Sequence, residues 1–123
     1  MTGKQEGIVT KENTAAVMGS GSLQVFATPA LVALMEKAAC NALEGTLDEG
    51  ITTVGTRMDV HHEAATPVGM RVWAEANLTS QEGRIYTFDI QAFDSCGLIG
   101  TAMHQRVAVK ALRFQEKTDE KRG

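Results

Sequence analysis

The sequence predicts an α+β fold in which an antiparallel β-meander sheet wraps around one long central helix. Two observations support this prediction. Residues 24–43 (QVFATPALVALMEKAACNAL) are rich in helix-forming residues, and no glycine interrupts them. From Ile51 onward, apolar residues instead recur at every second position in four consecutive segments separated by short turn sequences, which is the period of a β-strand.

The N-terminal region is expected to contribute one strand and a flexible connection. Residues 1–6 are polar, and we expect this end of the chain to be frayed. The β-branched residues within residues 7–18 predict a strand that is interrupted near Asn13. Residues 19–22 (GSGS) are expected to form a flexible connection to the helix.

The helix is predicted to begin at Thr28 and to bury one broad face. A threonine hydroxyl can accept a free backbone N–H at a helix start, and Pro29 fits the first turn. At about 100° per residue, the following side chains fill one face: Leu31, Leu34, Met35, Ala38, Ala39 and Ala42. Glu36 lies at the border of this face, where its carboxylate either reaches solvent or serves a function. Gly45 is the expected C-cap.

Four strands are predicted to follow the helix. In residues 51–65, the even positions share one face: Val54, Thr56, Met58, Val60 and His62. The odd positions, which include Gly55 and His61, share the other face. The inward residues of the next two strands are predicted to be Val72, Ala74, Ala76 and Leu78, and then Tyr86, Phe88, Ile90 and Ala92. The last strand is predicted to span residues 98–112, with its apolar residues at odd positions: Ile99, Met103, Val107, Val109 and Ala111.

Composition and charge limit the class of protein. A chain of 123 residues corresponds to one domain, predicted over residues 1–112 and followed by a charged C-terminal tail over residues 113–123. A net charge of −3 argues against a general nucleic-acid binder. The sequence has no signal-peptide pattern and no apolar run of membrane-spanning length, so we expect a cytoplasmic protein without a membrane partner. Cys40 and Cys96 alone do not make a disulfide framework.

The predicted architecture leaves sheet edges unpaired. A few strands around a single helix expose backbone N–H and C=O groups at those edges, and such edges favour association with another chain. We therefore expect a homodimer or a dimer of dimers.

Three side chains are candidates for acyl-transfer chemistry. The helix start favours developing negative charge, and Thr28 lies there either as a cap or as part of a site. Glu36 is a candidate nucleophile or general base, or a solvated carboxylate at the rim of the core. His62 is a candidate base, or a hydrogen-bonded core histidine. A hydroxyl, a carboxylate and an imidazole are the components of acyl-transfer sites, although periodicity does not show that these three meet.

A metal site is not expected. His61 and His62 are adjacent strand residues that point to opposite faces, so they cannot easily bind one ion. Gly55 within a strand indicates a bulge or a close approach by a ligand. Arg106 is one of several arginines that are either solvated or placed to meet a phosphate.

The sequence resembles the hotdog-fold acyl-CoA thioesterases and, within them, the fluoroacetyl-CoA thioesterase group. Three segments carry the resemblance: VFATPALVALMEKAA (residues 25–39), VHHEAATPVG (residues 60–69) and GTAMHQRVAV (residues 100–109). With the strands between them, the resemblance covers about residues 7–112. It implies a hotdog fold and the hydrolysis of an acyl-CoA substrate to a free acid and CoA, with no separate cofactor.

The resemblance also implies roles for individual residues. The family's catalytic threonine, glutamate and histidine correspond to Thr28, Glu36 and His62. A glycine and an arginine that assist at the family's substrate site correspond to Gly55 and Arg106. Two alternatives share the fold: a non-catalytic acyl-CoA-binding module, and a dehydratase that acts on acyl thioesters.

The segment before the helix differs from the pattern of that group. The fluoroacetyl-CoA enzyme carries an aromatic-rich lid there, whereas this chain has Gly19–Leu23 (GSGSL), and Pro29 replaces the glycine that follows the threonine. Glycine and serine supply little apolar area. We therefore expect weak discrimination between small acyl groups.

Overall fold

A single curved sheet surrounds the long helix that the sequence predicts. The computed structural model describes all residues from Met1 to Gly123. The long helix, α2, spans Thr28–Leu43. The strands are β1 (Thr2–Ile8), β2 (Ile51–His62), β3 (Arg71–Glu82), β4 (Ile85–Asp94) and β5 (Gly97–Lys110). Two further helices, α1 (Ala15–Met18) and α3 (Ala111–Asp119), and 3-10 turns at Lys11–Asn13 and Glu120–Arg122 complete the chain.

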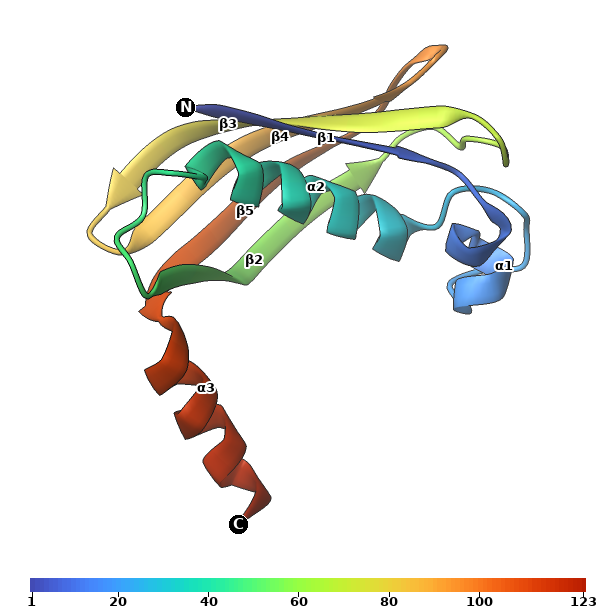
Figure 1. Cartoon of the computed structure of the whole chain (residues 1–123). Coiled ribbons are helices and arrows are strands. Elements are labelled where there is room, and N and C mark those ends of the chain that lie inside the picture. The colour runs from blue at the N-terminus through green and yellow to red at the C-terminus, as the bar shows by residue number, and fades with distance from the viewer.

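The five strands form one antiparallel sheet in the order β1-β3-β4-β5-β2. Short turns join β3, β4 and β5 as a meander, but β2, which the sequence placed first in the meander, pairs with β5 instead of β3. Figure 1 shows α2 lying across one face of this curved sheet. The predicted α+β architecture of an antiparallel sheet around one central helix is therefore confirmed, and β1 and β2 are its two edges.

α2 is buried through the apolar face that its sequence predicts. Its buried residues are Leu31, Met35, Ala38, Ala39, Ala42 and Leu43, while Leu34 is half-buried. Complete burial of a leucine or methionine side chain contributes about 1.5–3 kcal/mol, so this face anchors the helix on the sheet. The small residues serve a second purpose, because β1 passes close to them. A Cβ atom at Gly3 would overlap the backbone of Ala38 and Ala42.

The sheet presents the predicted residues of β3 and β4 to the helix. Val72, Ala74 and Ala76 of β3 are buried, and Leu78 is half-buried. Tyr86, Phe88, Ile90 and Ala92 of β4 are buried as well. The alternation of apolar and polar residues therefore assigned the faces of these two strands correctly.

The N-terminal prediction was wrong. Residues 1–6 are not frayed, because β1 pairs with β3 from Thr2↔Asn77 to Ile8↔Arg71. Backbone pairing at a sheet edge does not require apolar side chains, and Glu6 adds an ion pair to Arg71. Residues 7–18 do not form one strand. After Ile8 the chain makes a 3-10 turn and then α1, whose N-cap is Thr14.

The predictions for the end of the chain also need correction. β5 ends at Lys110, not at Leu112, and the residues expected to form a charged tail continue as α3, which has no buried residue. Figure 1 shows α3 projecting away from the sheet. The face of β5 was also assigned wrongly. Apart from Ile99, the buried residues lie at even positions, Gly100, Ala102, His104, Arg106 and Ala108.

Candidate active site

Thr28 and His62 meet at the start of α2. Thr28 is the first residue of the helix, Ala27 is the N-cap, and no side chain caps the helix. The Oγ1 atom of Thr28 instead lies 2.7 Å from Nδ1 of His62, which is the last residue of β2. The hydroxyl therefore contacts the imidazole and does not act as a cap.

The environment of His62 favours a neutral ring. Burial lowers the pKa of His62 below its ordinary value. Its second ring nitrogen, Nε2, is buried and has no hydrogen-bond partner. An unsatisfied buried polar atom is costly, and such atoms are typical of sites that a ligand completes. A neutral imidazole beside a hydroxyl can accept its proton. By contrast, the side chain of His61 is 70% exposed and lies near Asp59.

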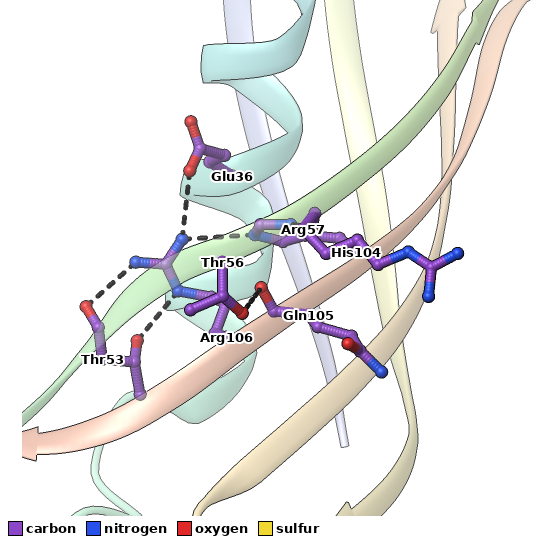
Figure 2. Close-up of polar contacts among 7 residues, drawn as sticks. All are labelled: Glu36, Thr53, Thr56, Arg57, His104, Gln105 and Arg106. Atoms are coloured by element: carbon purple, nitrogen blue, oxygen red, sulfur yellow. Dashed lines mark hydrogen bonds and ion pairs between the residues drawn. The ribbon is translucent and has the colours of Figure 1, made fainter.

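Glu36 and Arg106 form a second polar contact, halfway along α2. Oε2 of Glu36 lies 3.3 Å from Nη1 of Arg106. The Arg106 side chain is only 8% exposed, whereas that of Glu36 is 41% exposed. Thr53 fixes the rest of the guanidinium, because Nε donates to its Oγ1 at 2.8 Å and Nη2 donates to its carbonyl oxygen at 3.0 Å. Figure 2 shows Arg106 between these partners, with Glu36 reaching it from the helix.

Gly55 provides the space for this contact. It lies opposite Arg106 in the β2–β5 pairing. A Cβ atom at Gly55 would stand 2.6 Å from Oε2 of Glu36 and 3.3 Å from Nη1 of Arg106. Real Cβ contacts are longer than the first of these distances, so a side chain here would displace the carboxylate. Glycine at position 55 therefore permits the Glu36–Arg106 contact.

A bulge in β2 changes which of its residues face the helix. The pairing with β5 shifts register between Gly55 and Arg57. Before the shift, Gly55 faces inward opposite the buried Arg106, and the predicted inward positions Val54 and Thr56 were wrong. After the shift, Met58, Val60 and His62 pair with the buried even positions of β5 and face inward, as predicted.

His104 completes the second cluster and was not among the site residues predicted from the sequence. Its Nδ1 lies 2.7 Å from the carbonyl oxygen of Arg57, so Nδ1 must carry the proton because a carbonyl only accepts. Nε2 therefore accepts from Nη1 of Arg106 at 3.2 Å. Burial lowers the pKa of His104, which agrees with a neutral ring beside a guanidinium. The signal for His104 was its spacing, since it lies two residues from Arg106 on the same strand face.

The two clusters remain separate within one chain. Thr28 and Glu36 are eight residues apart on α2, which corresponds to about 12 Å along the helix axis. No hydrogen bond or ion pair joins the Thr28–His62 pair to the Glu36–Arg106 pair. The structure thus pairs Thr28 with His62, and brings Glu36 to Gly55 and Arg106, but it does not bring all five together.

No group of three or more His, Cys, Asp or Glu side chains is arranged to hold a metal ion. None of the helices combines the length and the apolarity needed to cross a bilayer.

Comparisons with known proteins identify relatives of this chain. Residues 9–111 match the model of the fluoroacetyl-CoA-specific thioesterase family. The fluoroacetyl-CoA thioesterase of Streptantibioticus cattleyicolor is 38% identical over 98 residues, which cover 80% of this chain and 70% of that protein.

Solved structures agree with this match. A structure of the fluoroacetyl-CoA thioesterase superimposes with a TM-score of 0.91 at 31% identity, covering 98% of this chain and 94% of that one. A thioesterase superfamily member from Thermus thermophilus gives a TM-score of 0.91 at 26% identity, covering 99% and 90% of the two chains. A hot-dog-like protein from Thermanaerovibrio acidaminovorans, at 24% identity and a TM-score of 0.88 over 100% and 91%, shares the fold.

These results confirm the hotdog fold and the thioesterase resemblance inferred from the sequence. The family match covers both polar clusters, from Thr28 to Arg106. The chain therefore belongs to the fluoroacetyl-CoA-specific thioesterase family.

Proposed function

We propose that this thioesterase hydrolyses small acyl-CoA esters with Thr28, Glu36 and His62 as its catalytic groups. Water supplies a hydroxyl to the acyl carbon, the C–S bond breaks, and the departing CoA thiolate takes a proton. Glu36 acts on the thioester carbonyl either directly or through a water molecule. Thr28 and His62 supply a hydroxyl and a proton acceptor 2.7 Å apart at the positive end of the α2 dipole.

The observation that carries this proposal is the placement of the Glu36 carboxylate. Glu36 is held by Arg106 over a position that is open only because residue 55 is glycine. A solvated rim carboxylate would not need a buried arginine fixed by Thr53 and His104. Arg106 and Gly55 thus position the carboxylate, and its 41% exposure leaves it accessible to substrate.

A panel of acyl-CoA esters assayed for free thiol tests the proposal. A thioesterase releases CoA thiol from at least one ester in the panel. A binding module would retain acyl-CoA without releasing thiol, and a dehydratase would change the acyl chain while the thioester stays intact. Either of these results would contradict the proposed reaction.

We further infer that the working protein is a homodimer or a dimer of dimers whose sites combine two chains. β2 is an edge strand with unpaired backbone groups along one side. Antiparallel pairing of two β2 strands in the register that sets Met58 opposite Asp59 would set His62 of one chain opposite Gly55 of the other. This arrangement would bring the Thr28–His62 pair of one chain next to the Glu36–Arg106 pair of the other. Within one chain, these two pairs lie too far apart to act together.

Subunit complementation tests this arrangement. Thr28→Ala and Glu36→Gln are each expected to inactivate the homodimer. Mixed dimers of the two variants are expected to recover about half of the wild-type activity, because one of the two symmetric sites then contains neither substitution. The measurement is thiol release by dimers purified with two different affinity tags.

The control is a dimer purified with the same two tags in which both chains carry Glu36→Gln. This dimer should stay inactive. If each site instead took all its groups from one chain, every site of the mixed dimer would carry one substitution. Inactive mixed dimers, or a monomeric mass in sedimentation, would therefore overturn the composite site.

The segment before α2 determines how closely the acyl group is surrounded. Residues 19–23 contribute one large apolar side chain, Leu23, and it is exposed. Val17 and Met18 of α1 are exposed as well. This segment contains no aromatic side chain to shield a small acyl group, although Phe26 is buried beside the helix start.

Discrimination between acetyl-CoA and fluoroacetyl-CoA is therefore expected to be weak. One small-group difference in a closed apolar pocket is worth about 1–3 kcal/mol, and a more open pocket gives less. After correction for intrinsic reactivity, the two kcat/KM values should differ by less than about a hundredfold. Larger apolar acyl groups should be hydrolysed at least as well. A corrected preference for fluoroacetyl-CoA of several thousandfold would show that another segment closes the pocket.

A further inference from the structure

A groove between α3 and the end of the sheet has the composition of a nucleotide site. It has a volume of about 720 Å³, which lies within the range of small-ligand pockets. Its apolar surface comes from Ile51, Ala108, Val109 and Phe114. No acidic residue lines it, and five basic residues do: Arg84, Lys110, Arg113, Lys117 and Lys121.

This concentration of positive charge contrasts with the chain as a whole, whose net charge is −3. α3 also contains acidic residues, but Glu116 and Asp119 do not line the groove. None of the five groove cations forms an ion pair within the chain. The groove therefore presents unneutralised cations around an apolar floor, which suits an anion that carries an apolar or aromatic group.

The position of the groove relates it to the candidate active site. Arg106 and Lys110 both lie on β5, four residues apart, which corresponds to about 13 Å along a strand. A second pocket lies between the C-terminal half of α2 and the start of β2. It is lined by Thr53, which holds Arg106, and by Ile51, which also lines the groove. The second pocket thus adjoins the basic groove at Ile51 and the Arg106 side chain through Thr53.

We propose that this groove binds the phosphorylated adenosine of coenzyme A, while the pantetheine arm extends over the second pocket toward Arg106. The inference rests on the proposed function, because it assigns the nucleotide end of the same substrate. The five groove cations have no anionic partner within the chain, and the 3′-phosphate and the diphosphate of CoA would supply such partners. Phe114, which is 44% exposed, offers a ring on which adenine can stack. The pantetheine arm is a linear chain, and its apolar and amide groups suit the second pocket.

Neutralising two of the groove cations tests the proposal. Arg113→Ala with Lys117→Ala is expected to raise KM for acyl-CoA roughly tenfold and to leave kcat unchanged, as the loss of two charge-assisted contacts predicts. The same variant should hydrolyse the acyl-N-acetylcysteamine thioester, which lacks the nucleotide, with wild-type kcat/KM. Removal of the 3′-phosphate from acyl-CoA should weaken its binding to the wild-type protein. The same removal should weaken binding to the variant much less.

The matched control removes the same two residue types elsewhere. Lys11→Ala with Arg122→Ala changes the net charge equally, and neither residue lines the groove. This control should keep the wild-type KM. An equal rise in KM for both double variants would overturn the nucleotide site. A loss of kcat/KM by the groove variant with the acyl-N-acetylcysteamine thioester, as large as its loss with acyl-CoA, would overturn it too.

A binding measurement separates this proposal from the proposed function. Adenosine 3′,5′-bisphosphate, titrated calorimetrically, should bind the wild-type protein and the control but not the groove variant, whether or not any thioester is hydrolysed. Inorganic phosphate at the same concentration should not displace it. If α3 instead packs against a second copy of the chain, the groove variant would lose oligomeric mass with no change in nucleotide binding, and the proposal would be wrong.

Discussion

Replacement of Glu36 by glutamine is expected to lower kcat for thioester hydrolysis by about two orders of magnitude or more. The amide keeps the size and shape of the side chain and removes its negative charge. An amide can neither attack the thioester carbonyl nor accept a proton from water. The loss should appear in kcat, since Glu36 acts on the reacting carbon rather than on the nucleotide.

The control for this variant is a test that the protein around Arg106 remains folded. The two contacts of Arg106 to Thr53 and its contact to His104 do not involve Glu36. We therefore expect a near-native circular dichroism spectrum and melting temperature. Near-normal hydrolysis by the folded Glu36→Gln protein would identify Glu36 as a solvated rim carboxylate.

Replacement of His62 by alanine is expected to reduce hydrolysis by about two orders of magnitude, whereas His61→Ala is expected to change it little. The two residues are neighbours, yet they face opposite sides of β2. His62 contacts Thr28 and is half-buried, and this burial lowers its pKa and keeps it able to accept a proton. His61 is exposed beside Asp59.

These two substitutions control for each other, since each removes one imidazole from the same strand. Rates should be compared across pH. Because burial lowers the pKa of His62, wild-type activity should persist somewhat below the ordinary histidine range and fall as the pH drops through the lowered pKa. A large loss in His61→Ala with a mild one in His62→Ala would mean that the register of β2 is shifted by one residue.

The helix and the central strands could be predicted from the sequence because packing against each other imposes a regular spacing on their apolar residues. α2 and the inner faces of β3 and β4 are uniformly apolar where they touch, so alternation identifies them. β5 shows where this reasoning fails. Its inner face carries His104 and Arg106, and its outer face carries Met103, Val107 and Val109. A rule that places apolar residues inward selects the wrong face at a polar site.

The remaining errors have local causes. The bulge after Gly55 reverses the faces within β2, and no periodicity can anticipate an inserted residue. β1 is held by backbone pairing to β3, which leaves no apolar signature in Thr2–Ile8. The residue pattern marked Thr28, Glu36, His62, Gly55 and Arg106 as candidates and the family resemblance gave them roles, whereas their division into two separate clusters required coordinates.

The contact between Gly55 and Glu36 restricts the order in which this sequence can change over evolutionary time. A methyl group at position 55 would meet the mobile end of the glutamate rather than rigid backbone. The protein would then stay folded while the carboxylate left Arg106. Selection for folding alone would therefore not preserve this glycine, and selection for turnover would. Once a lineage has lost Glu36, position 55 is free to accept a side chain, and the ancestral glutamate cannot return to its place until the glycine returns first.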